Sequence, residues 1–400
     1  LMANTSGCYS TAIGHQALEA SVATGDTGNT AVGGSAMLSN TTGTNNTALG
    51  RCALVCNTTA VNNTAVGKDA LKLSTTGTQN TAIGMISLDA ATSGSYNSGL
   101  GYASLSVLTT GAFNVASGYV AGNGITTGSN NVAIGAHSLS TTTAADNNTA
   151  VGFCSLKSNT TGCGLVAVGS SALDSNTTGE NNTAVGFNAL SANTTASANV
   201  AIGESSQSAT TTGAQNVTVG NSSGIANTTG ASNVFIGHKA ACSNTTGANN
   251  VAVGKDALDE NTTGVENTAI GTNSLGHVTT GSYNTAVGKD AGRDHTTAAS
   301  LVAIGHSALR GNTTGHSNVA VGVDALIANT TGIYNTAIGL NSLNQHTTGS
   351  RNAAVGTSAG TAITDGIGNT VIGMEAGKNI VAGGGNTVLG SLKPDGVYSP

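Results

Sequence analysis

The chain has 400 residues, of which 58 are glycine and two are proline; tryptophan is absent and aromatic residues make up 3%. Large side chains supply most of the burial that offsets ordering entropy, so this composition excludes an ordinary globular core. Charged residues make up 8%, the formal net charge is -6, and no basic cluster occurs, which argues against nucleic acid and anionic membranes as partners. No stretch is long and apolar enough to span a bilayer, so we expect no membrane insertion.

A repeat runs through almost the whole chain. Segments such as NTAIG and NTAVG end on 23 glycines, from Gly14 to Gly390, and from Gly33 onward the interval is always 17 residues. The first interval is 19, because residues 22–28 carry two extra positions. A fixed period of this length is typical of solenoids and excludes collagen, which needs glycine at every third residue. We therefore predict an all-β, parallel β-solenoid of about 23 coils over residues 1–393, and an exit segment at 394–400.

Each coil has the consensus N-T-T-G-x-x-N-T-A-V-G-x-x-A-L-x-x, and its strand is expected at NTAVG. The residue before the repeated glycine is Val, Ile or Leu in 22 of 23 coils, with Ser117 as the exception. Two residues earlier the side chain is usually Thr or Val, and alternation puts both rows on one strand face. We interpret this face as the solenoid interior. The intervening residue is Ala in 18 of 23 coils and is predicted to point outward.

The remaining rows of the coil also have physical explanations. The repeated glycine indicates a positive φ or a close approach of neighbouring chain, whereas the looser glycine of NTTG, replaced by Ala60 and Ala145, needs no positive φ. Leucine four residues after the glycine predicts a second inward row, and coils with glycine there, such as Gly122 and Gly360, are expected to be thinner. Asparagine four residues before the glycine predicts a buried ladder of amides between coils.

An outward stripe of small alanines suits close docking of another β surface, because Thr, Lys or Glu would be expected on a solvated face. We therefore expect the chain to associate with itself along this stripe, and end-to-end stacking into a filament stays open because neither end of the repeat carries an evident cap.

The strand motif is similar to the head repeats of trimeric autotransporter adhesins, most clearly at residues 131–138, 199–203 and 318–322, and to NTAIG/NTTG arrays of phage and viral tail-fibre proteins. The resemblance implies a left-handed β-roll, a homotrimer and surface attachment. The coil here is longer than the adhesin repeat, and no coiled-coil stalk or anchor is present in the sequence. We therefore expect a rigid fibre shaft, extracellular or on a cell or virion surface, that is not an enzyme and that contacts surface glycans or a host receptor.

Two other functions remain open. Flat Thr-rich and Asn-rich solenoids include ice-binding proteins with similar repeats, and the Thr-Thr of NTTG would form the ordered array. A polysaccharide-active β-helix is less favoured. Asp256, Asp290 and Asp324 share one row on every second coil, about 10 Å apart, which is too far for a shared proton. Neighbouring lysines favour solvated charge, and no catalytic or cofactor-binding residues are assigned.

The remaining polar and aromatic residues give weaker signals. His15, His238 and His306 share a row but lie many coils apart, so no metal site is expected. The six cysteines lack a zinc spacing, although Cys52–Cys56 or Cys154–Cys163 disulfides stay open. Aromatics flank the strand in two rows that could stack on sugars or pack along loop edges. These are Tyr9, Tyr96, Phe113, Tyr283 and Tyr334 before it, and Tyr102, Tyr119, Phe153 and Phe187 after it.

Many N-x-T sequons occur, among them those at Asn40, Asn176 and Asn261. They could carry glycans in a eukaryotic secretory pathway, or serve only as turn chemistry in a bacterium or phage. The sequence leaves both possibilities open.

Overall fold

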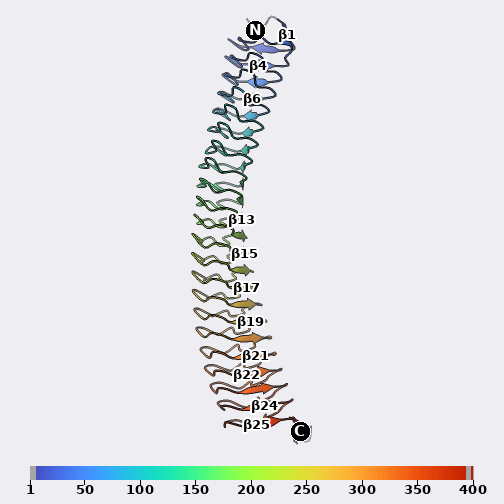
Figure 1. The fold of residues 1–400 in the computed structure, drawn as a ribbon, viewed down its shortest axis with the longest axis vertical. Helices are drawn as coiled ribbons and strands as arrows, with labels where there is room; N and C mark the ends of the chain where they lie inside the picture. Colours follow the sequence, from blue (N-terminus) through green and yellow to red (C-terminus); the bar gives the residue numbers. More distant parts are fainter. Residues whose placement is uncertain (1–5, 393–397, 400) are drawn as a thin grey trace. The chain divides into compact units, whose positions relative to one another are not determined.

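The computed structural model describes residues 6–392 and 398–399, and the predicted exit segment at 394–400 lies mostly outside this part. The chain falls into two compact units, Leu1–Asn199 and Val200–Pro400, and each is a parallel β-solenoid. The described residues contain no helix. In each unit the strands follow one another in chain order, one to each coil (Figure 1).

The first unit contains thirteen short strands. Its main sheet pairs β2 with β4 and then each strand with the next, all parallel and in register, so that Thr47 lies beside Thr64 and Leu49 beside Val66. A separate parallel pair, β1 and β3, is built partly from the two extra residues of the first coil. The strands are β1 Ser6–Cys8, β2 Thr11–Ile13, β3 Thr24–Asp26, β4 Thr30–Val32, β5 Thr47–Leu49, β6 Thr64–Val66, β7 Thr81–Ile83, β8 Ser98–Leu100, β9 Val115–Ser117, β10 Val132–Ile134, β11 Thr149–Val151, β12 Val166–Val168 and β13 Thr183–Val185.

The second unit repeats the same arrangement. Its parallel sheet runs from β14 to β25, and the antiparallel pair β26 and β27 follows, so the parallel series ends where the repeat ends. The strands are β14 Val200–Ile202, β15 Val217–Val219, β16 Val234–Ile236, β17 Val251–Val253, β18 Thr268–Ile270, β19 Thr285–Val287, β20 Val302–Ile304, β21 Val319–Val321, β22 Thr336–Ile338, β23 Ala353–Val355, β24 Thr370–Ile372, β25 Thr387–Leu389, β26 Ser391–Leu392 and β27 Tyr398–Ser399.

The strand faces are the reverse of the sequence expectation. In β17 and β18 the central Ala252 and Ala269 are completely buried, while Ile270 is 40% exposed. The same order holds in nearly every coil: alanine points inward, and the Thr or Val and the Val or Ile on either side point outward. The prediction that the valines and isoleucines form the interior is therefore wrong. The 17-residue stacking is confirmed, because residues 17 apart pair in register between neighbouring strands. This stacking depends on the period of the sequence and not on which strand face is buried.

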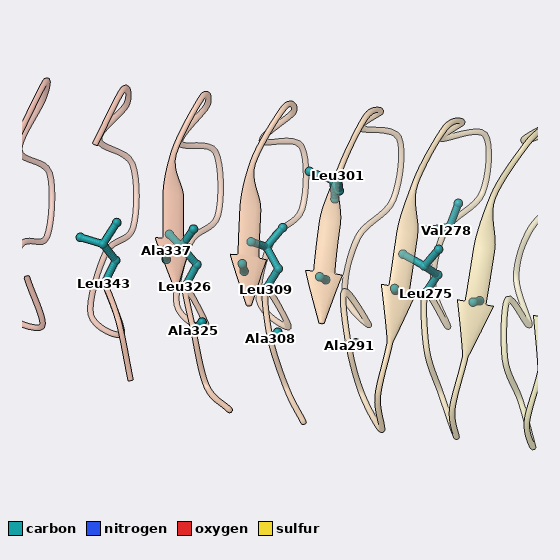
Figure 2. Packing of buried hydrophobic residues seen from close by; sticks show 14 of the residues in the cluster. Leu275, Val278, Ala291, Leu301, Ala308, Leu309, Ala325, Leu326, Ala337 and Leu343 are labelled. Carbon is teal, nitrogen blue, oxygen red and sulfur yellow. The ribbon is translucent and has the colours of Figure 1, made fainter. Parts of the chain in front are cut away.

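The leucine row explains why only a methyl group fits on the inner strand face. Leu258, Leu309 and Leu326 are completely buried, as predicted, and fill the coil interior from the wall opposite the strand. Figure 2 shows Leu309, Leu326 and Leu343, from three successive coils, lying in a row inside the solenoid. Because leucine and asparagine side chains take most of the narrow interior, little volume is left at the strand itself.

Two coils with glycine in the leucine row keep a filled interior. A Cβ built on Gly224 would lie 2.9 Å from the Phe235 ring, and one built on Gly360 would lie 3.0 Å from Ile363 and 3.1 Å from Val371. Phe235 and Val371 are large residues in the alanine row, so they use the volume that the missing leucine leaves. At Gly224 and Gly360 larger neighbours therefore compensate for the glycine, where the sequence had suggested thinner coils; at Gly122 and Gly292 the alanine row keeps its alanines, Ala116, Ala286 and Ala303.

The repeated glycine satisfies both explanations offered for it. Gly254 has a φ of 140°, and a Cβ there would lie 2.6 Å from the carbonyl oxygen of Gly271 in the next coil. The looser glycine of NTTG has no positive φ at Gly43, Gly77 or Gly94, as predicted. The corner at the repeated glycine therefore needs glycine both for its backbone conformation and for the close spacing between coils.

Non-glycine residues also adopt the left-handed region at three places in the coil, which the sequence did not indicate. In one coil these are Asn249, Asp256 and Leu258, with φ between 53° and 57°. Asn and Asp tolerate this region, whereas leucine pays roughly 1–2 kcal/mol for it. The cost is offset because the leucine is buried and its amide donates to Ser274 O of the next coil at 2.9 Å.

Candidate functional surface

The outward strand face is the most distinctive surface of the molecule. We call its outward residues the aliphatic stripe: the first and third residues of β2 and β4–β13 in the first unit, and of β14–β25 in the second. Strand register places like residues side by side, for example Val302 beside Val319 and Ile304 beside Val321. Exposure is substantial at Ile304 and Ile338, each 39%.

The aliphatic stripe carries no charge. In each unit its positions are Thr, Val, Ile, Leu, Ser or Ala, although 30 residues of the chain are Asp, Glu, Lys or Arg. A solvated sheet face normally carries charged side chains that keep it soluble and prevent association. A continuous uncharged row of β-branched side chains therefore marks a surface suited to a flat, repetitive partner.

Two ladders of buried asparagine hold successive coils together, and the first is the predicted one. In this ladder the backbone N–H of Asn267 donates to Asn250 Oδ1 at 3.0 Å, and Asn250 Nδ2 donates to Gly264 O at 2.8 Å. Leu165 and Leu301, which replace asparagine in this row, are buried as well. The ladder spans the interior from the strand to the NTTG corner, so it fixes the width of the coil.

The asparagine of NTTG forms the second ladder, which the sequence did not predict. Asn261 Nδ2 donates to Asn244 Oδ1 of the preceding coil at 2.7 Å and to Gly264 O at 3.1 Å. Both amide hydrogens are used, and both asparagines are completely buried. The strict N-T-T-G spacing could have indicated this role, because only a short amide reaches the carbonyl three residues on and the coil before it.

The threonines of NTTG form one exposed row, because only one threonine of each pair is exposed. The first threonine is partly buried, and its hydroxyl donates to the next coil, as from Thr245 Oγ1 to Thr262 O at 2.9 Å. Only the second threonine, Thr246 in this coil, is exposed. The aliphatic stripe, with two outward rows, is a second regular surface in each unit.

Four aromatic residues of the first unit stack in two pairs. The rings of Tyr96 and Phe113 are 4.8 Å apart and nearly parallel, and those of Tyr102 and Tyr119 are 5.4 Å apart. The stacking partners cover part of the ring faces that a sugar would use. This geometry favours packing along the coil edge over sugar binding at these four residues.

Several charged side chains form surface ion pairs. Asp256 and Asp290 lie 3.4 Å and 4.0 Å from Lys255 and Lys289, as expected for solvated charge. A hollow of 370 Å³ lies beside this row, where Gly276 leaves a gap. Its lining residues are Asp256, Asp259, Glu260, Asn273, Gly276, His277 and Arg293. Within the described residues no group of three or more His, Cys, Asp or Glu could hold a metal ion.

The cysteines show no activated thiol among those with a resolved pKa change. Burial raises the pKa of Cys242 to about 11, and its hydrogen bond to the Asp259 carboxylate, Sγ to Oδ1 at 2.8 Å, acts in the same direction. Burial also raises the pKa of Cys154. No disulfide joins Cys52 to Cys56 or Cys154 to Cys163. A high thiol pKa disfavours the nucleophilic thiolate.

His295 takes the place of an asparagine in the second ladder. Its Nε2 lies 2.7 Å from Ala298 O, and Nδ1 lies 3.0 Å from Asn312 Nδ2. The ring is completely buried, and burial lowers the pKa of His295 to about 4. This geometry requires a neutral ring in which Nε2 donates to the carbonyl and Nδ1 accepts from the amide.

We expect His295→Asn to reduce the acid sensitivity of the chain. Between pH 6.5 and pH 4 the unfolded chain binds a proton at His295 that the folded chain does not, so its contribution to stability is complete above pH 6.5 and is lost as pH falls. The loss amounts to about 3 kcal/mol at pH 4. Urea unfolding of the chain and the variant at pH 7 and pH 4 measures it. Equal pH dependence in both would contradict the expectation.

Comparison with known proteins assigns the chain to no family. No protein-family model matches the chain, and no curated protein matches it. In the described residues no helix is long and apolar enough to cross a membrane.

Proposed function

We propose that the chain is a non-enzymatic fibre segment, located outside the cell or on a cell or virion surface, whose copies associate along the aliphatic stripe. One observation carries the proposal: each unit exposes an uncharged double row, mostly Val, Ile and Thr, that runs in register from strand to strand. This stripe replaces the alanine stripe that the sequence suggested as the contact surface, because the alanines are buried.

The size of the stripe fits a stable contact. The twelve strands β14–β25, spaced about 4.8 Å apart, extend over about 58 Å, and two outward rows with their side chains are about 12 Å wide. The product, about 700 Å², approaches the roughly 800 Å² that each partner buries in a typical specific interface. Burial of apolar surface contributes about 25 cal/mol per Å². Burial of the whole stripe would therefore contribute more free energy to association than a few scattered surface contacts.

A second copy of the chain is the partner whose surface matches. A ridge of side chains that repeats at the coil spacing interlocks best with another ridge of the same period. Only a chain with the same coil spacing keeps that match over a whole unit. The resemblance to trimeric adhesin heads supports three chains and a left-handed coil. Such an assembly would cover the stripes and leave the NTTG corners exposed for contact with surface glycans or a receptor.

We expect Ile304→Glu together with Ile338→Glu to abolish self-association while the coils stay folded. Both side chains are exposed on the stripe, so the isolated chain tolerates the carboxylates, whereas a contact between stripes would bury them without partners. Analytical ultracentrifugation gives the oligomeric state, and circular dichroism gives the fold.

The matched control is Thr314→Glu with Thr331→Glu, two exposed threonines of the NTTG corner in nearby coils. This control should keep the oligomeric state of the natural chain. A natural chain that remains a folded monomer at the highest working concentration would end the proposal.

Ice binding is the second candidate, and the aliphatic stripe favours it over the NTTG corner as the ice-binding surface. Thr268 beside Thr285 and Ile270 beside Val287 present methyl and hydroxyl groups in a regular array. Such a surface would have to remain uncovered, so this candidate requires a monomer. Thermal hysteresis in the monomeric fraction, lost in Ile304→Glu with Ile338→Glu, would select it over the fibre segment.

A further inference from the structure

The fold divides the sequons of the chain into two classes, and this division bears on where the protein can be made. An N-linked glycan requires Asn-x-Ser or Asn-x-Thr, and the repeat contains that motif many times. The described residues hold eleven sequons with a completely or almost completely buried asparagine and five with an exposed one. The buried acceptors are Asn40, Asn57, Asn159, Asn176, Asn193, Asn216, Asn227, Asn244, Asn261, Asn312 and Asn329. The exposed acceptors are Asn45, Asn62, Asn147, Asn181 and Asn221.

The buried class cannot accept a sugar in the folded chain. Asn176 is typical: its Nδ2 donates to Asn159 Oδ1 at 2.9 Å and to Gly179 O at 3.1 Å, and no part of the residue reaches solvent. Asn57 and Asn261 bond in the same way, to the preceding asparagine and to the carbonyl three residues on. Each amide hydrogen of these side chains is therefore committed inside the ladder.

Glycan transfer would replace one of those hydrogens. The Nδ2–C1 bond to the sugar forms, the bond from C1 to the pyrophosphate oxygen of a lipid-linked oligosaccharide breaks, the pyrophosphate leaves with the electron pair, and one amide proton is released. The modified Nδ2 keeps a single donor and carries a hydrated oligosaccharide. Inside a coil whose interior is closely packed, neither the lost hydrogen bond nor the sugar can be accommodated.

The exposed class lies at a corner where a glycan can project into solvent. Asn45, Asn62, Asn147 and Asn181 all stand five residues before the repeated glycine, with φ between 55° and 60°. Their side chains are exposed, unlike those of the asparagines that directly follow them. Asn221 is exposed on another corner and donates to Glu204 Oε2 at 3.1 Å.

We infer that the chain folds only where its N-T-T-G sequons escape N-linked glycosylation, so that it is not matured in a compartment that transfers such glycans to nascent chains. Transfer acts on the chain before it folds, and each of the eleven buried acceptors is then open to it. The glycan sites compatible with the fold are the five exposed asparagines. The inference depends on the solenoid fold alone and stands or falls separately from the function proposed above.

The test is secretion of the full chain from cultured eukaryotic cells behind a signal peptide, with and without an inhibitor of lipid-linked oligosaccharide synthesis. Without the inhibitor, we expect the amount of folded chain in the medium to be lower by at least about tenfold, since each glycan orphans buried polar groups. Mass spectrometry of the retained chain should find sugars on the N-T-T-G asparagines.

A variant separates the two classes. The second threonine of N-T-T-G is exposed, so replacing it by alanine, as in Thr42→Ala and Thr178→Ala, removes a sequon without touching the ladder. The full variant carries all ten such changes together with Thr218→Ala, which removes the sequon at Asn216 and places at the strand centre the alanine that most coils have there. Secretion of this variant should return without the inhibitor. Glycans should then map to exposed asparagines.

The control replaces the exposed acceptors instead. Glutamine occurs naturally in the same corner row at Gln79 and Gln215, so Asn45→Gln and its equivalents preserve the fold. This control should still fail to be secreted. Three results would each overturn the inference: a folded, secreted natural chain with sugars on N-T-T-G asparagines, the same chain with those sites unmodified, or no recovery when the inhibitor is present.

Discussion

Replacing one repeated glycine by alanine, Gly254→Ala, should destabilise its part of the solenoid by at least about 3 kcal/mol. The backbone there has a φ of 140°, which alanine adopts only under strain. The added methyl group would also lie 2.6 Å from Gly271 O and 2.7 Å from Gly271 C in the following coil. Neither atom can move without parting the two coils, because both belong to the main chain.

The matched control is Gly276→Ala in the next coil. Its φ is not positive, and the nearest atoms to a new Cβ are Asn273 O at 3.3 Å and Arg293 Cγ at 3.5 Å. We expect a change of less than about 0.5 kcal/mol. Because a solenoid can unfold in parts, amide hydrogen exchange in β17 and β18 should accompany denaturant unfolding. Equal exchange in the two variants would show that the repeated glycine is not required.

The period of the sequence predicts the architecture, because a spacing of 17 residues brings like residues together whichever face they occupy. Strand position, the inward leucines and the asparagine ladder that includes Asn250 follow from the same alignment. The glycine corner at Gly254 was predictable for a similar reason: only a conformation or a close contact that excludes Cβ explains a glycine that never changes.

The orientation of the strand was not predictable from hydrophobicity. Alternation shows that Val251 and Val253 share a face opposite Ala252, but it does not say which face is inside. The larger residues were placed inside because burial of Val and Ile contributes more. The opposite wall decides otherwise, since Leu258 already occupies the interior and leaves room for one methyl group.

A signal for the correct orientation was present in the exceptions. The alanine row holds Phe235 and Val371, and near each the leucine row holds a glycine, Gly224 and Gly360. Such compensation requires that the two rows face each other across one interior. The left-handed backbone at Leu258 gave no comparable signal, because leucine disfavours that region and only the completed coil stabilises it.

A pair of lysine substitutions in β18 distinguishes the two strand faces directly. Ala269→Lys should destabilise the second unit by about 4 kcal/mol or more, because the site is completely buried and the ammonium would have neither space nor a partner. Ile270→Lys, one residue later and 40% exposed, should change the stability of the isolated chain by less than about 1 kcal/mol. Denaturant unfolding and hydrogen exchange in β18 measure both.

The pair is informative because the two possible orientations predict opposite orders. If the isoleucines formed the interior, Ile270→Lys would unfold its coils and Ala269→Lys would leave them intact. With alanine inside, the folded Ile270→Lys chain instead loses affinity for other copies, since its ammonium lies on the aliphatic stripe. One neighbouring pair of substitutions therefore tests the inner face by stability and the outer face by association.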